Sequence, residues 1–296
     1  MLADVQRILA FGTFRRLFLV IARSVHHNGA DLYTEAIGSG PPILLIHSGV
    51  TDSRMWDDLW APLATNHSVI RYDLRGHGRS TIPPTPYAHH SDARAILDAW
   101  GVDRAMVIGA SMGGGVALDL ALTCPDRVAG LVLINTLAGM ETPSPELRAG
   151  WDAVNAAWEA GDLDGATELE LRMWVDGPFR QPHAVDLAVR ERVRAMDRAL
   201  LARAAEQQAA EELDLEPPTR DRLADIRCPV LLLVGLLDLP DALVSAATLE
   251  AGLPNVRRVD IPGAAHLPSM ERPATVESAM ATFLANLVWE PHVPGP

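Results

Sequence analysis

Short apolar runs alternate with stretches of helical periodicity along most of this chain. An Asn28-Gly29 pair separates two short stretches with strand character, and such a pair is a strong β-hairpin signal. Further runs typical of buried strands lie at residues 43–47, 69–73, 105–109, 131–134, 230–234 and 256–261. Apolar strands separated by helices are typical of a mostly parallel sheet covered on both faces. The pattern therefore predicts an α/β protein with a mostly parallel eight-stranded sheet flanked by helices.

The alternation stops between residues 140 and 222, after the sixth predicted strand. This stretch contains no strand-like run and is rich in Ala, Glu and Arg, with tryptophans among them. It predicts several amphipathic helices that form a cap over a cleft, although plain surface helices are an alternative. The predicted division of the chain is an N-terminal extension (1–23), a core (24–139 and 223–290) and a helical cap (140–222).

The N-terminal extension contains a short apolar run, 17–22, directly after Arg15 and Arg16. This arrangement superficially resembles a signal peptide. The run is too short to span a bilayer, and no A-x-A-like cleavage site follows it. We therefore expect an amphipathic helix over residues 1–23, with an over-long start as the alternative, and no attachment to a membrane.

Composition narrows the classes of function. The chain has 296 residues and a net charge of −13, and all 25 basic residues are arginine. The missing lysine excludes Schiff-base chemistry and a phosphate-binding P-loop. The acidic balance disfavours a nucleic-acid partner, because phosphate neutralisation needs a basic surface. The two cysteines, Cys124 and Cys228, form no metal-ligand pattern and suggest a reduced, cytoplasmic protein.

Residues 106–115 combine an apolar run, a G-x-S-x-G core and a helix start made of small residues. This order is typical of a nucleophile elbow, in which a strand turns sharply into a helix and presents a serine hydroxyl. Gly109 and Gly113 lack a Cβ, so the neighbouring backbone can approach closely around Ser111. Met112 would then offer its backbone N–H to an oxyanion at the positive end of the helix.

A serine hydroxyl needs a base to take its proton, and the base needs an acid to orient it. Among ten histidines, His266 alone follows a late strand through a Gly-containing approach. Asp238 ends a tight turn after the buried run at 230–234, with Asp241 as a reserve candidate. Asn135 ends the preceding strand, but an amide cannot serve as the acid. The predicted catalytic residues are Ser111, Asp238 and His266.

Two further groups of residues complete the predicted site. Gly49 lies at the end of an early buried strand and would donate the second N–H of the oxyanion hole, beside Met112. His47 is expected to brace this loop rather than to act as a base. The residues expected to contact the substrate are Val50, Trp151, Trp158, Met173 and Trp174.

Five segments, taken together, resemble the α/β-hydrolase fold superfamily in the right order. The resemblance covers roughly residues 25–288, and within the superfamily the chain looks most like esterases and 3-oxoadipate enol-lactonase-like hydrolases with a serine nucleophile. Ser48 departs from the pattern, because related chains usually have glycine there. The segments are 44–49 (LLIHSG), 72–80 (YDLRGHGRS), 109–114 (GASMGG), 235–238 (GLLD) and 263–266 (GAAH).

The resemblance implies a serine hydrolase that needs no cofactor or metal and cleaves an ester or lactone of a small, largely apolar molecule. Dehalogenases and epoxide hydrolases are disfavoured because their nucleophile is aspartate. Ala110 and Leu267 argue against carbon–carbon bond hydrolases, which usually have asparagine and tryptophan at these places. Perhydrolysis or acyl transfer by the same triad is an alternative, as is a ligand-binding protein without activity. A small molecule is the expected partner, and a homodimer is left open.

Overall fold

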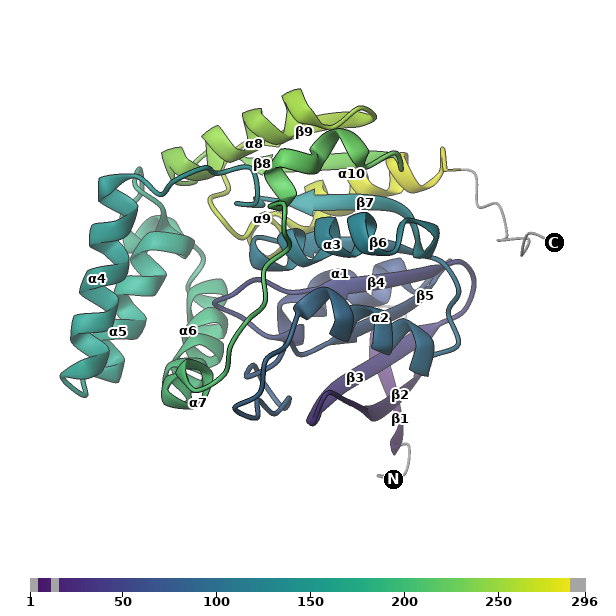
Figure 1. The fold of residues 1–296 in the computed structure, drawn as a ribbon, viewed down its shortest axis with the longest axis horizontal. Helices are drawn as coiled ribbons and strands as arrows, with labels where there is room; N and C mark the ends of the chain where they lie inside the picture. Colours follow the sequence, from purple (N-terminus) through teal and green to yellow (C-terminus); the bar gives the residue numbers. More distant parts are fainter. Residues whose placement is uncertain (1–4, 12–15, 288–296) are drawn as a thin grey trace.

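The computed structural model describes residues 5–11 and 16–287, and in this part of the chain one sheet contains nine strands (Figure 1). The strand order is β1-β2-β3-β5-β4-β6-β7-β8-β9. The first three neighbouring pairs in this order, β1-β2, β2-β3 and β3-β5, are antiparallel. The remaining pairs, from β5-β4 to β8-β9, are parallel. The strands are β1 (Val5–Phe11), β2 (Arg16–His27), β3 (Ala30–Gly38), β4 (Pro42–Ile46), β5 (Ser68–Tyr72), β6 (Ala105–Ala110), β7 (Val128–Ile134), β8 (Val230–Gly235) and β9 (Val256–Ile261).

Eight of these strands, β2 to β9, correspond to the predicted set, and β1 adds one strand at the edge of the sheet. The helix predicted over residues 1–23 is wrong where the structure describes it, because Val5–Phe11 and Arg16–His27 are antiparallel strands. Residues 1–4 and 12–15 lie outside the described residues. The physical reason is a period of two: Phe18 and Val20 are buried while Leu17 and Leu19 are exposed.

Helices cover both faces of the sheet, and successive residues of each central strand point to opposite faces. In β6, Ile108 packs into the cluster that includes α1 and α10, whereas Val107 packs into the cluster that includes α2, α3 and α8. The core helices are α1 (Asp57–Leu63), α2 (His89–Ala99), α3 (Met112–Thr123), α8 (Pro240–Gly252), α9 (Pro268–Glu271) and α10 (Pro273–Leu284). Short 3-10 turns lie at Ser53–Trp56, Pro125–Arg127 and Thr219–Asp225.

The chain between β7 and β8 is helical and extends to one side of the sheet (Figure 1). We call residues 140–222 the cap segment. Arg180 ties it to the core through an ion pair of 2.5 Å with Glu271, and Arg192 does so through one of 2.6 Å with Asp58. Its elements are α4 (Pro145–Glu159), α5 (Leu163–Glu170), a π-helical turn (Leu171–Asp176), a 3-10 turn (Pro182–Ala184), α6 (Leu187–Leu201) and α7 (Ala204–Gln208).

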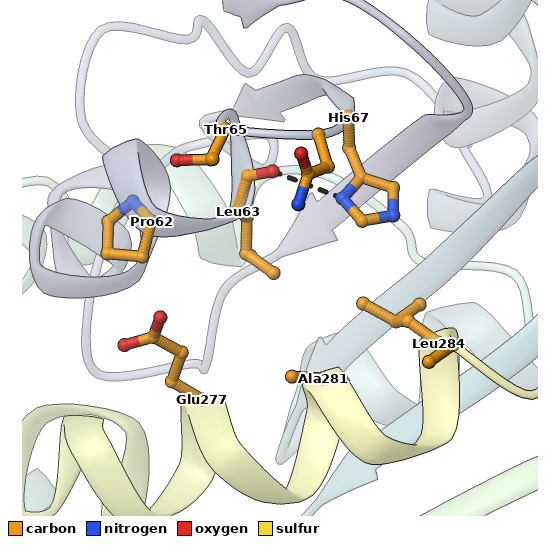
Figure 2. A pocket seen from close by; sticks show the side chains of 9 residues that line it. Pro62, Leu63, Thr65, His67, Glu277, Ala281 and Leu284 are labelled. Atoms are coloured by element: carbon orange, nitrogen blue, oxygen red, sulfur yellow. Dashed lines mark hydrogen bonds between the residues drawn. The ribbon is translucent and has the colours of Figure 1, made fainter. Parts of the chain in front are cut away.

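A surface groove of about 440 Å³ lies between the end of α1 and α10 (Figure 2). Pro62, Leu63 and Leu284 contribute apolar lining, and His67 donates a hydrogen bond of 3.1 Å to the Leu63 carbonyl. None of the predicted site residues lines this groove. Among the helices of the described residues, none has the length and apolar character needed to cross a membrane.

Candidate active site

Ser111 lies at the sharp turn where β6 passes into α3. Its backbone has φ 51° and ψ −116°, and positive φ is uncommon for a residue with a Cβ. The turn is held on both sides: the Ser111 N–H donates to the Ile134 carbonyl (2.8 Å), and the Gly114 N–H donates to the Ser111 carbonyl (2.9 Å). The Ser111 hydroxyl is therefore presented at the carboxyl edge of the parallel strands, as the G-x-S-x-G pattern predicts.

The glycines of this turn are required by the close approach of the backbone. A Cβ on Gly113 would collide with the carbonyl oxygens of Ile46 and His47, which end β4. A Cβ on Gly109 would collide with the Gly113 carbonyl. Gly115 differs from these two glycines, because a Cβ at this position would contact only the Ala138 methyl, at an ordinary distance of 3.9 Å.

This contrast gives a matched pair of variants. We expect Gly113→Ala to lower the free energy of unfolding by more than about 3 kcal/mol, or to prevent folding, because backbone must move to admit the methyl. Gly115→Ala should be neutral or stabilise by up to about 1 kcal/mol, since alanine favours a helix over glycine. Urea denaturation followed by circular dichroism measures both. Equal stability of the two variants would contradict this account of the turn.

His266 and Asp238 complete a hydrogen-bonded chain with Ser111. The Ser111 hydroxyl is 2.8 Å from His266 Nε2, and His266 Nδ1 is 2.7 Å from Asp238 Oδ2. An acid on Nδ1 fixes the tautomer that leaves Nε2 free to accept the hydroxyl proton. All three residues are buried, with 8% of Ser111, 2% of His266 and none of Asp238 exposed. Three residues far apart in sequence therefore meet at one edge of the sheet.

The Asp238 carboxylate accepts further hydrogen bonds, whereas Asp241, the reserve candidate for the acid, has other partners. The Leu239 N–H donates to Asp238 Oδ1 at 2.7 Å, and Asn135 Nδ2 donates to Asp238 Oδ2 at 2.5 Å. Asp241 instead accepts from the backbone N–H and the hydroxyl of Ser144, at 2.7 and 2.8 Å. Asp241 thus anchors the start of α4 and does not contact His266 in this structure.

Gly49 and Met112, the two predicted donors of the oxyanion hole, lie side by side. A Cβ on Gly49 would be 3.8 Å from the Met112 Cβ, and Met112 is the first residue of α3, where an N–H has no intrahelical partner. The Ser48 carbonyl accepts from His47 Nδ1 (2.8 Å) and from the Thr51 N–H (3.2 Å). The Ser48 C=O and the Gly49 N–H belong to the same trans peptide group and point in opposite directions. The Gly49 N–H is therefore directed away from His47 Nδ1 and the Thr51 N–H.

His47 braces this loop, as the sequence predicts. Its Nε2 accepts from the Leu74 N–H at 2.9 Å, so the ring is neutral with its proton on Nδ1. Burial lowers the pKa of His47 to about 4, which keeps it uncharged at neutral pH. His77 holds the next carbonyl, with its Nε2 3.0 Å from the Gly49 oxygen. His47 contacts backbone rather than the Ser111 hydroxyl.

Of the five residues expected to contact substrate, Trp174 is the one that the structure sets against the triad. Its ring centroid is 4.5 Å from that of His266. Trp158 donates a hydrogen bond of 2.9 Å to the Leu201 carbonyl and so joins α4 to α6. Met173 packs against Gly150 of α4, and Val50 packs against the core, while Trp151 is half-buried in α4. Contact of all five residues with a substrate stays a prediction.

Two acidic residues near Trp174 are absent from the sequence prediction. Glu170 of α5 lies close to the Trp174 side chain, and Asp197 of α6 lies within reach of the Glu170 charge. Burial raises the pKa of Glu170 to about 7 and, together with the Glu170 charge, that of Asp197 to about 8. No sequence signal identifies such a pair, because its burial depends on how α5 and α6 pack. Within the described residues, no group of three or more His, Cys, Asp or Glu side chains could hold a metal ion.

Comparison with known proteins supports the fold. The sequence model of the alpha/beta hydrolase fold family matches residues 41–273. A protein from Azorhizobium caulinodans, provisionally named carbamate hydrolase RutD, is 31% identical over 88% of this chain and 98% of its own length. The pimeloyl-[acyl-carrier protein] methyl ester esterase of Xylella fastidiosa is 30% identical over 86% of this chain and all of its own. The enol-lactonase structure from Burkholderia xenovorans aligns with a TM-score of 0.73 at 26% identity, over 89% of this chain and all of that one.

Proposed function

The chain belongs to the alpha/beta hydrolase fold family, and on this premise we propose that it is a serine hydrolase that cleaves a carboxylic ester or lactone through an acyl-enzyme. One observation carries the proposal: the Ser111 hydroxyl, the His266 imidazole and the Asp238 carboxylate form one hydrogen-bonded chain, with contacts of 2.8 and 2.7 Å. A serine becomes a competent nucleophile when a base accepts its proton and an acid orients that base.

The proposed mechanism follows from these contacts. His266 Nε2 takes the proton from Ser111 Oγ as the oxygen attacks the carbonyl carbon. The Gly49 and Met112 N–H groups hold the oxyanion at the N-terminus of α3, where loss of one such donor costs about 3 kcal/mol of barrier. His266 then protonates the leaving alcohol oxygen, and the acyl group stays on Ser111. In the second half, His266 takes a proton from water as the water oxygen attacks the acyl-enzyme ester, and it then gives this proton to Ser111 Oγ as the carboxylic acid leaves.

The substrate class rests on the relatives and on the surroundings of the triad. The similar proteins are named for hydrolysis of a methyl ester, an enol-lactone and a carbamate, each of which contains a carbonyl carbon bonded to a second oxygen. The indole of Trp174 lies against the His266 ring, and the Met112 side chain lies beside Gly49. These apolar side chains favour a small, largely apolar ester or lactone over a charged one.

A fluorophosphonate probe tests the proposal without knowledge of the substrate. We expect stoichiometric labelling of the native chain, with the adduct on the peptide that contains Ser111, because only an activated hydroxyl attacks the phosphorus readily. A panel of p-nitrophenyl esters of graded acyl length and several lactones should then identify the preferred class. A native protein that remains unlabelled and leaves every ester and lactone intact would overturn the proposed function.

A further inference from the structure

Three residues with a Cβ have a left-handed backbone in the described part of the chain: Asn28, Ser111 and Asn135, with φ of 43°, 51° and 46°. Asn28 forms the hairpin turn between β2 and β3, which requires positive φ. Ser111 forms the nucleophile elbow. Asn135 directly follows β7 and is 2% exposed. Backbone strain at a buried residue persists where the surroundings impose it, and such residues cluster at functional sites. The conformation of Asn135 therefore calls for a functional explanation.

The Asn135 side chain joins three parts of the site. Its Nδ2 donates to Asp238 Oδ2 at 2.5 Å and to the Ala265 carbonyl at 2.9 Å. Its Oδ1 accepts from the Gly235 N–H at 2.8 Å. Since a backbone N–H can only donate, the orientation of the amide follows from these partners. One side chain thus contacts the end of β8, the acid, and the residue just before His266.

The Asn135 amide contacts the same carboxylate oxygen of Asp238 that accepts the hydrogen bond from His266. Asp238 Oδ2 accepts from both His266 Nδ1 and Asn135 Nδ2, so the amide fixes the position of the oxygen that orients the imidazole. Because Asp238 is fully buried, each donor to its carboxylate also replaces hydration that the charge has lost. The bond to the Ala265 carbonyl restrains the backbone that carries the imidazole. Both partners of the His266–Asp238 hydrogen bond are therefore held by Asn135.

We propose that Asn135 is a positioning residue of the triad. Through its left-handed backbone and its amide, it fixes the position of the Asp238 carboxylate relative to the loop that carries His266. The proposal rests on the function proposed above. Asn135 acts through Asp238 and Ala265 and does not contact the reacting atoms. Its loss should therefore lower turnover rather than substrate binding, since the base is misaligned in the transition state while the pocket is unchanged.

Asn135→Gly tests this, with Asn28→Gly as the matched control. Both variants remove an asparagine side chain from a left-handed position that glycine occupies without strain. We expect Asn135→Gly to lower kcat for the preferred ester by about 10- to 100-fold with KM within about twofold, a range typical of lost outer-shell support. The far-downfield proton resonance of the His266–Asp238 hydrogen bond should shift or broaden. Asn28→Gly should leave kcat and the resonance unchanged.

The remaining outcomes also decide the proposal. A folded Asn135→Gly protein with native kcat and an unmoved resonance would refute it. If Asn135→Gly does not fold, Asn135→Ser replaces it, because Ser111 shows that a serine in this protein adopts a positive φ, and the shorter side chain cannot reach Asp238. If both variants unfold, Asn135 contributes to the stability of the fold, and its role as a positioning residue is rejected. The resonance belongs to the resting protein, so it reports on Asn135 even if the native chain fails to react with the probe, a result that would count against the proposed function instead.

Discussion

Ser111→Ala is expected to lower kcat for the preferred ester by about 10⁶-fold and to abolish fluorophosphonate labelling, while the protein stays folded. The hydroxyl is the atom that would form the acyl-enzyme, and no other hydroxyl contacts His266 in the described part of the chain. The oxyanion donors and the binding pocket would remain, so a small residual rate above the uncatalysed reaction is expected. Steady-state kinetics on extensively purified protein, with thermal denaturation to check folding, measures the effect.

Ser278→Ala is the matched control. Ser278 is an exposed residue of α10 and is not among the predicted site residues, so its hydroxyl should not affect turnover or labelling. If Ser111→Ala kept native turnover, the acyl-enzyme mechanism would be wrong, whatever the relatives of this chain do. If both variants lost activity, an unstable or heterogeneous preparation would be indicated, and the folding check would reveal it.

The parts of the fold that local chemistry determines were predictable from sequence. The Asn28-Gly29 pair indicates a hairpin because both residues tolerate positive φ, and β2 and β3 pair around it. The run at 105–115 combines a strand, a strained serine and a small-residue helix, each of which has its own residue signature. Strand β1 and the part of β2 before residue 24 were not predicted, since a short apolar run such as 17–22 has the same composition in a helix and in a strand.

The candidate site also contains a part that was predictable from sequence and a part that was not. Ser111, Asp238 and His266 follow predicted strands, so their meeting at one sheet edge can be anticipated, and the structure brings them within hydrogen-bond distance. The environment of the triad depends on tertiary packing. The sequence indicates only that Asn135 cannot be the acid; its three contacts require β7, β8 and the His266 loop to be in place. The catalytic role of each residue stays a prediction until it is tested.

Asp238→Asn is expected to lower kcat by about 10⁴-fold, with the fold retained. The amide is nearly isosteric with the carboxylate, but it carries no charge to stabilise the imidazolium that forms when His266 takes the Ser111 proton. It also cannot serve every donor around it: His266 Nδ1 and Asn135 Nδ2 both contact Oδ2, and an NH₂ group there would face donors. The imidazole would then turn or adopt the other tautomer, and Nε2 could no longer accept the hydroxyl proton.

Asp241→Asn separates this effect from the mere loss of a nearby buried carboxylate. Asp241 is 8% exposed and holds the backbone and hydroxyl of Ser144 at the start of α4, three residues beyond Asp238. Its replacement should lower the melting temperature by a few degrees and leave kcat within about threefold, because the lost charge-assisted hydrogen bonds stabilise a helix start and not the imidazole. Kinetics of the two variants side by side therefore assign the acid. A larger loss of kcat in Asp241→Asn than in Asp238→Asn would transfer that role to Asp241 and would require the loop after β8 to rearrange in the working protein.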